Sequence, residues 1–145
     1  MMKPSGLFYV IFLFSFLACQ QQPQAIDYGH DACDFCRMTI VDKTHSAQLV
    51  TPKGKQYKYD AIECMLNDLK QGKLETQILQ VANYQNAGEM IDAQQAHYLI
   101  SPHIQSPMGE NLSALKTEVD AQQLQNEVSG DTYSWEDLLV KFNAK

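Results

Sequence analysis

Three sulfur-bearing side chains lie within six residues near the start of this chain, in the segment Cys33-Asp34-Phe35-Cys36-Arg37-Met38. Thiolates and thioethers are soft ligands, and together they favour Cu(I), because Zn²⁺ sites rarely use methionine. The Cys-x-x-Cys spacing by itself is less specific, since it is equally typical of a redox disulfide, half of a zinc site or a structural bridge. The segment therefore predicts a site built from sulfur side chains, and the rest of the chain must decide between metal binding, a redox disulfide and a structural bridge.

Two further sulfur groups are candidate ligands, Cys64 and Met108. Cys64 lies one position off the apolar stripe of a predicted helix, where a ligand, a disulfide partner and an inert buried thiol are all consistent with the pattern. Met108 stands between Pro107 and Gly109, where neither helix nor strand packing accounts for a methionine. Proline fixes the course of such a loop and glycine lets the backbone come close to a neighbour, so we interpret Met108 as a ligand. Met65 lies on the stripe itself and is interpreted as core packing.

The four histidines are weaker candidates. His30 is three residues from Cys33, and His103 shares a loop with Met108, so each could complete a coordination sphere. An isolated loop histidine is more often simply solvated. His45 and His97 flank predicted strands, and we expect both to be structural.

The first 18 residues are typical of a secretory signal. A positive start at Lys3 precedes an apolar run from Leu7 to Ala18, which is shorter than the ~20 residues that span a bilayer. Ala18-Cys19 followed by a glutamine-rich stretch resembles a bacterial lipobox, although Phe16 stands where leucine is usual. We therefore predict a lipoprotein signal over 1–18, a lipidated flexible tether over 19–32 with lipid on Cys19, and a location in the cell envelope facing the periplasm.

Cysteine number and charge narrow the function further. Three of the four cysteines remain besides Cys19, an odd number that favours metal binding over a complete disulfide framework. Removal of Lys3 with the signal leaves 10 basic and 17 acidic residues, a formal net charge of −7. That balance argues against nucleic acid, which requires a basic face, and is consistent with a cationic partner or a metal ion.

The periodicity of the remaining chain predicts alternating strands and helices. A hairpin (46–51 and 56–59) closes through Pro52 and Gly54, and a helix follows with Asp60 as N-cap and Glu63 completing a capping box. Later strands are expected at 78–84, 96–100, 111–116 and 132–135, and later helices at 120–128 and 136–142. The prediction is an α+β fold in which residues 33–145 form two small ββαβ-type units, approximately 33–86 and 87–145, packed as one compact body.

Several short segments, in order over roughly residues 30–140, carry a resemblance to a known family. They are Cys36-Arg37-Met38, the hairpin leading to Tyr59-Asp60, Cys64-Met65, the run from Asp92 through Ala96-His97-Tyr98, Pro107-Met108-Gly109, and Gly130-Asp131 through Trp135. Together they resemble the NosL family, which are nitrous oxide reductase accessory lipoproteins that bind copper on the outer face of the cytoplasmic membrane. The family pattern in the first segment is Cys-Gly-Met, and Arg37 takes the place of the glycine.

The resemblance implies a function as well as a fold. It implies Cu(I) binding through Cys36 with Met108, Met38 as an additional donor, and a ligand set that the extra Cys33 could alter. It also implies two small ββαβ-type units and delivery of copper to apo-nitrous oxide reductase, or to another copper enzyme, without catalysis.

Three alternatives remain open from the residues alone. The first is a membrane-anchored thiol–disulfide oxidoreductase using Cys33 and Cys36, although a glutamine-rich stretch precedes the pair where such enzymes have a strand. The second is a zinc-stabilised domain using Cys33, Cys36, Cys64 and a histidine, which leaves Met38 and Met108 unexplained. The third is a disulfide-stabilised envelope protein that binds a partner.

Overall fold

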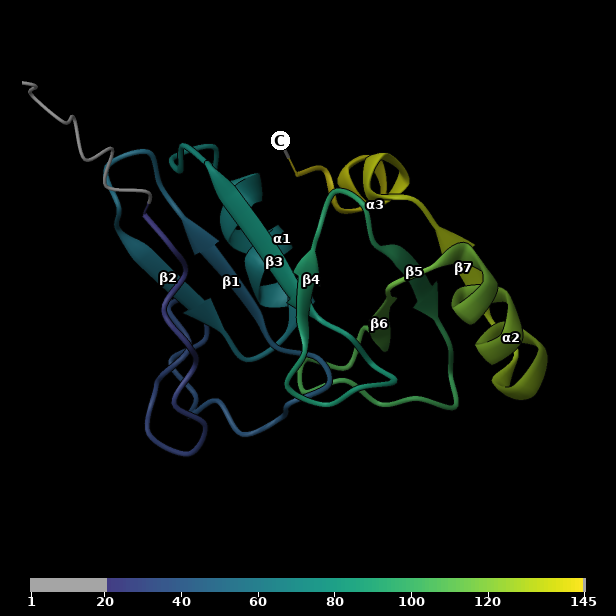
Figure 1. Cartoon of the computed structure of the whole chain (residues 1–145). Coiled ribbons are helices and arrows are strands. Elements are labelled where there is room, and N and C mark those ends of the chain that lie inside the picture. The colour runs from purple at the N-terminus through teal and green to yellow at the C-terminus, as the bar shows by residue number, and fades with distance from the viewer. Residues whose placement is uncertain (1–20, 145) are drawn as a thin grey trace, which may run out of the picture.

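The computed structural model describes residues 21–144, and within that range the chain forms two antiparallel sheets and three helices (Figure 1). The predicted signal peptide and Cys19 lie outside the described residues. The elements are β1 (Ala47–Val50), β2 (Gln56–Tyr59), α1 (Ile62–Lys70), β3 (Ile78–Ala82), β4 (Met90–Asp92), β5 (His97–Ile100), β6 (Leu112–Leu115), α2 (Glu118–Val128), β7 (Asp131–Tyr133) and α3 (Trp135–Phe142). Within residues 21–144, none of the helices combines the length and the apolar character that a membrane crossing requires.

The first unit is a four-stranded sheet with the strand order β2-β1-β3-β4. The predicted hairpin is confirmed, with Ala47 opposite Tyr59 and a turn in which the amide of Gly54 donates to the carbonyl of Thr51 at 2.8 Å. Gly54 has a φ of 82°, which explains why a glycine stands there. Helix α1 packs on this sheet through a stripe of buried side chains that includes Met65 and Leu66, so the interpretation of Met65 as core packing is confirmed.

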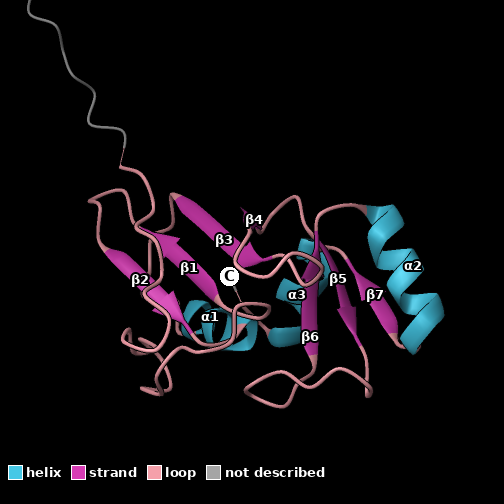
Figure 2. Cartoon of the chain, turned by 60° about the horizontal axis from the view of Figure 1, so that its bottom comes forward, coloured by secondary structure: helices cyan, strands magenta, loops and turns pink. Residues whose placement is uncertain are grey.

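The second unit is a three-stranded sheet with the order β6-β5-β7, and Figure 2 shows α2 along its outer side. The two sheets meet where Asn83 and Ala114 form a parallel bridge, beside an amide of Tyr84 that donates to the carbonyl of Ala114 at 2.8 Å. Side chains from both units, among them Leu66 of α1 and Leu138 of α3, belong to one hydrophobic core. The predicted α+β fold with two small units in one compact body is therefore confirmed.

Some predicted boundaries and caps are wrong. Ala61, not Asp60, occupies the N-cap of α1, and no side chain caps that end of the helix. Glu63 does not close a capping box, because its side chain is buried in the protein. Helix α2 begins near Thr117, whose hydroxyl accepts from the amide of Asp120 at 3.1 Å, so Asp120 lies inside the first turn.

Two further differences concern short or weakly patterned segments. Trp135 is the first residue of α3 and not the end of a strand, because Ser134 caps that helix with a capping box. Strand β4 was not predicted, since three residues carry no readable alternation.

The packed body begins earlier than the predicted boundary at Cys33. Ile26 is buried in the core, the amide of Gly29 donates to the carbonyl of Ile40 at 2.8 Å, and Ala32 forms a bridge with Thr39. Upstream of these residues, the amide of Gln24 donates to the side chain of Gln56 at 3.1 Å. The few apolar residues of this segment give no periodic signal, so its sequence pattern is that of a tether, although Ile26 is buried and hydrogen bonds hold the segment to the body.

Candidate metal centre

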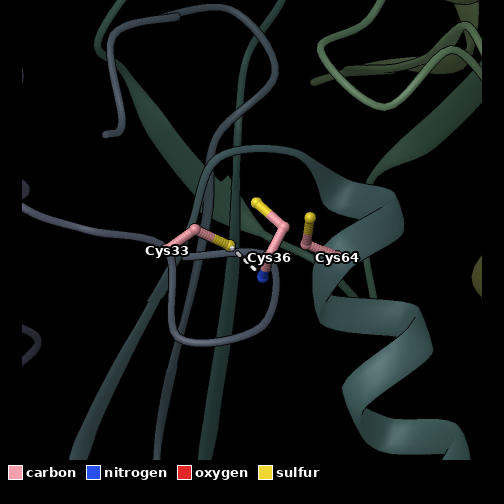
Figure 3. Close-up of side chains that lie close together, drawn as sticks. All are labelled: Cys33, Cys36 and Cys64. Atoms are coloured by element: carbon pink, nitrogen blue, oxygen red, sulfur yellow. Dashed lines mark hydrogen bonds between the residues drawn. The ribbon is translucent and has the colours of Figure 1, made fainter. Parts of the chain in front are cut away.

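A tight turn presents the first two thiols. The amide of Cys33 donates to the carbonyl of Met38 at 2.8 Å, and the amide of Arg37 donates to the carbonyl of Cys33 at 3.0 Å. A third amide, that of Cys36, donates to the sulfur of Cys33 at 3.4 Å (Figure 3). The turn is therefore closed on itself by its own backbone, and its geometry fixes the spacing of Cys33 and Cys36.

Arg37 adopts a backbone conformation that suits glycine better than arginine. Its φ is 68°, in the left-handed region that side chains with a Cβ rarely occupy. The turn thus holds an arginine at a strain of about 1–2 kcal/mol. The Arg37 side chain is exposed.

Helix α1 supplies the third thiol from its first turn. The sulfur atoms of Cys33, Cys36 and Cys64 all lie within 4.8 Å of one another, and none of the three forms a disulfide. Figure 3 shows the sulfurs converging between the turn and the helix. Cys33 and Cys64 are fully buried, whereas Cys36 is partly exposed. The cluster therefore has a closed inner side and one thiol within reach of solvent.

The thiols have strongly different acidities because they share hydrogen bonds. The thiol of Cys64 donates to the sulfur of Cys33, and with backbone amides this lowers the pKa of Cys33 to about 5 although burial opposes the shift. The same hydrogen bond raises the pKa of Cys64. Burial raises the pKa of Cys36, and the nearby sulfur of Cys33 adds to that effect. The arrangement stabilises one thiolate beside two thiols, a set from which a soft metal ion can displace protons.

The two candidate methionines lie in loops. Met38 is close to the cluster in sequence, two residues after Cys36, and the loop of Met108 is linked to the cluster by a hydrogen bond. Met38 ends the turn and exposes 55% of its surface, and Met108 exposes 37%. The loop of Met108 is attached to α1, because the hydroxyl of Ser106 donates to the carboxylate of Glu63, the residue before Cys64. Their role as copper donors stays a prediction.

The histidines take no part in the cluster. Among the described His, Cys, Asp and Glu side chains, the three cysteines form the only group of at least three whose ligand atoms are close enough together to hold a metal ion. His30 is exposed and lies 3.2 Å from Asp27. His45 is buried between the two units, with Asp42 at 2.9 Å and Ser113 at 3.2 Å. The zinc alternative thus lacks its fourth, histidine ligand.

Glu63, directly before Cys64 in α1, is a residue whose role the sequence misassigned. It is completely buried, and burial raises the pKa of its carboxyl group. Its position three residues after Asp60 fitted a capping box, so nothing in the local pattern pointed to a partner 43 residues away. By helical spacing Glu63 shares a face with the polar residues Asn67 and Lys70, so the sequence carried no signal of its burial.

A three-thiol cluster with one accessible sulfur, on a scaffold of two small sheets and three helices, defines a small protein with a site for a soft metal ion. The chain belongs to the NosL family, whose sequence profile matches residues 23–141. Its fold is similar to that in the crystal structure of the copper chaperone NosL from Shewanella denitrificans, with a TM-score of 0.71 and 20% identity over 81% of this chain and 95% of that one. No curated protein matched the sequence. The family and the fold inferred from the sequence are both confirmed.

Proposed function

We propose that this protein is a membrane-anchored, extracytoplasmic chaperone that binds Cu(I) as cargo and delivers it to an apo-enzyme, nitrous oxide reductase or another copper enzyme. The observation that carries the proposal is the convergence of Cys33, Cys36 and Cys64 within 4.8 Å, with only Cys36 partly exposed. Three soft sulfur donors suit Cu(I), and the family membership supports the same cargo.

The exposure of the donors suits transfer as well as binding. Cys33 and Cys64 are sealed inside, whereas Cys36, Met38 and Met108 reach the surface. An acceptor's ligands can therefore approach the copper ion from the exposed side while the protein still holds it. We assign Cys36 and Met108 as the principal donors, Met38 as an additional donor, and Cys33 and Cys64 as the inner thiols that complete the set.

The remaining parts of the proposal concern location. A lipoprotein signal over residues 1–18 and lipid on Cys19 would keep the protein in the cell envelope, facing the periplasm. The metal site then lies where an exported copper enzyme is assembled. Globomycin, which blocks lipoprotein signal cleavage, should cause the precursor to accumulate, and Cys19→Ser should release the protein from the membrane fraction.

Copper binding is tested by anaerobic titration of the reduced mature chain with Cu(I) against a chromophoric chelator, with Zn²⁺ in parallel. We expect one Cu(I) per chain, bound far more tightly than zinc. Cys36→Ser should abolish tight binding, and Met108→Leu should weaken it without loss of the fold. Met90→Leu, at a partly buried methionine of β4, is the matched control and should bind like the parent. Preferential retention of zinc, or parental copper affinity in both site variants, would contradict the assignment.

The oxidoreductase alternative has one observation in its favour, the lowered pKa of Cys33. Thiol–disulfide exchange also requires that the attacking thiolate reach its substrate. Cys33 is fully buried, and the accessible thiol, Cys36, has its pKa raised. The pair is therefore arranged in the opposite way to a redox-active Cys-x-x-Cys motif, whose exposed cysteine is the acidic one.

A further inference from the structure

A buried carboxylate connects the thiol cluster to the loop of Met108. Glu63 lies in the first turn of α1, directly before Cys64, and its side chain has no exposed surface. One carboxylate oxygen accepts from the hydroxyl of Ser106 and, at 3.4 Å, from the amide of Leu112. The other oxygen is buried without a hydrogen-bond partner among the described residues. Burying an acidic group that is only half satisfied opposes folding, so its presence calls for a role other than stability.

Ser106, the partner of Glu63, closes the loop that carries Met108. Its carbonyl accepts from the amide of Gly109 at 3.1 Å, and its hydroxyl accepts from the amide of Asn111 at 2.9 Å. Both hydrogen bonds span Met108, so the course of the chain on either side of the methionine is fixed by one serine. The hydroxyl of that serine donates in turn to Glu63. The chain of contacts thus runs from the residue beside Cys64 to the residues that enclose Met108.

We propose that Glu63 is a positioning residue of the copper site, which locks the Met108 loop onto the first turn of α1 and so fixes the thioether of Met108 relative to the thiol of Cys64. This inference rests on the proposed function, because it takes Met108 as a copper donor. A donor held in place before the metal arrives loses less conformational freedom on binding, which increases affinity.

Direct coordination by Glu63 is not what the geometry indicates. Its carboxylate is not part of the group formed by the three thiols. Carboxylate oxygen is also a hard ligand, poorly matched to Cu(I). Glu63 therefore acts through its hydrogen bonds to Ser106 and Leu112, which lie on either side of Met108 in the chain.

The test is a double-substitution cycle on the mature chain, combining Ser106→Ala with Met108→Leu and measuring Cu(I) affinity by chelator competition. Ser106→Ala alone should weaken Cu(I) binding by roughly tenfold, as loss of an outer contact to a metal site typically does. In the Met108→Leu background the same change should have no further effect, since the donor that the loop positions is already gone. Glu63→Gln keeps an acceptor oxygen for the serine and should stay within about threefold of the parent.

A matched control separates positioning from a general loss of stability. Ser46→Ala removes another buried hydroxyl, which lies 2.8 Å from that of Tyr28, and should leave copper affinity unchanged. X-ray absorption of the Cu(I) forms should show one fewer sulfur neighbour in Ser106→Ala, as in Met108→Leu, whereas a purely structural effect would lower the melting temperature and retain the coordination.

The outcomes distinguish the inference from the proposed function. If the parent binds no Cu(I), or if Met108→Leu binds it like the parent, the donor assignment fails and the inference falls with it. If Met108→Leu weakens binding but Ser106→Ala does not, or if the two effects multiply, Met108 remains a donor and the positioning role of Glu63 is refuted.

Discussion

The left-handed turn residue Arg37 gives the sharpest test of how this sequence encodes its site. Its φ of 68° strains any residue with a Cβ by about 1–2 kcal/mol. Replacement by glycine removes that strain but makes the unfolded chain more flexible, which costs about 0.5–1 kcal/mol. Among the described residues the guanidinium group forms no ion pair, so little else is lost. Arg37→Gly should therefore raise the free energy of unfolding by about 1 kcal/mol.

The measurement is urea unfolding of the reduced, metal-free chain, with the slope of the transition compared between variants. The gain should appear as a higher midpoint at an unchanged slope, and as a rise of about 4 °C in melting temperature for a domain of this size. Asn143→Gly is the control, because its φ is 51° and asparagine tolerates this region with little strain. The control should lose about 0.5–1 kcal/mol, because the unfolded chain becomes more flexible and little strain is relieved. An Arg37→Gly chain that loses as much stability as the control would refute the assignment of strain to this turn.

Three other substitutions test the fold around the site. Gly130→Ala should destabilise the protein by about 3 kcal/mol or more in urea unfolding. The added Cβ would clash with the backbone oxygen of Ile100, and the φ of 122° is unfavourable for alanine. Parental stability would contradict this packing. Ser134→Ala should cost about 1 kcal/mol by the same assay, since it removes the cap of α3; a change below about 0.3 kcal/mol would show that the cap is dispensable. Hydrogen bonds from His45 and Thr44 outweigh burial and lower the pKa of Asp42 below its ordinary 3.8. The ionised Asp42 therefore contributes its full stabilisation above pH 3.8, and this contribution is lost as the pH falls through the pKa of the folded state. The stability difference between the parent and Asp42→Asn should therefore shrink by about 1 kcal/mol between pH 7 and pH 3, and a constant difference would count against this origin of the shift.

The sequence was most informative where local pattern and tertiary structure agree. The hairpin and the amphipathic stripe of α1 are local signals, and both were predicted. They left the role of Cys64 open between a ligand, a disulfide partner and an inert thiol, and only the tertiary structure brings its sulfur within 4.8 Å of those of Cys33 and Cys36.

Two of the misassignments, those of Glu63 and Ile26, share one physical cause, which is competition from partners far away in the chain. Glu63 has the right position for a capping box, but its hydrogen bond to Ser106 binds it to a loop 43 residues later. Ile26 lies in a segment of mostly polar and small residues, yet the core formed by distant strands and helices buries it. Neither contact leaves a trace in the neighbouring residues, so no local pattern could have revealed it.

The packing of residues 22–32 along the body has a consequence for the reach of the protein. The carbonyl of Gln22 accepts from the side chain of Gln56 at 3.4 Å, so the chain already lies against edge strand β2 there. An extended chain spans at most about 3.5 Å per residue, so lipid on Cys19 would hold Gln22 within about 10 Å of the membrane surface. The linker between the lipid and the folded body would then be only a few residues long. With the lipid anchor and the copper transfer proposed above, the packed body would stay close to the bilayer, and an acceptor would collect its copper there.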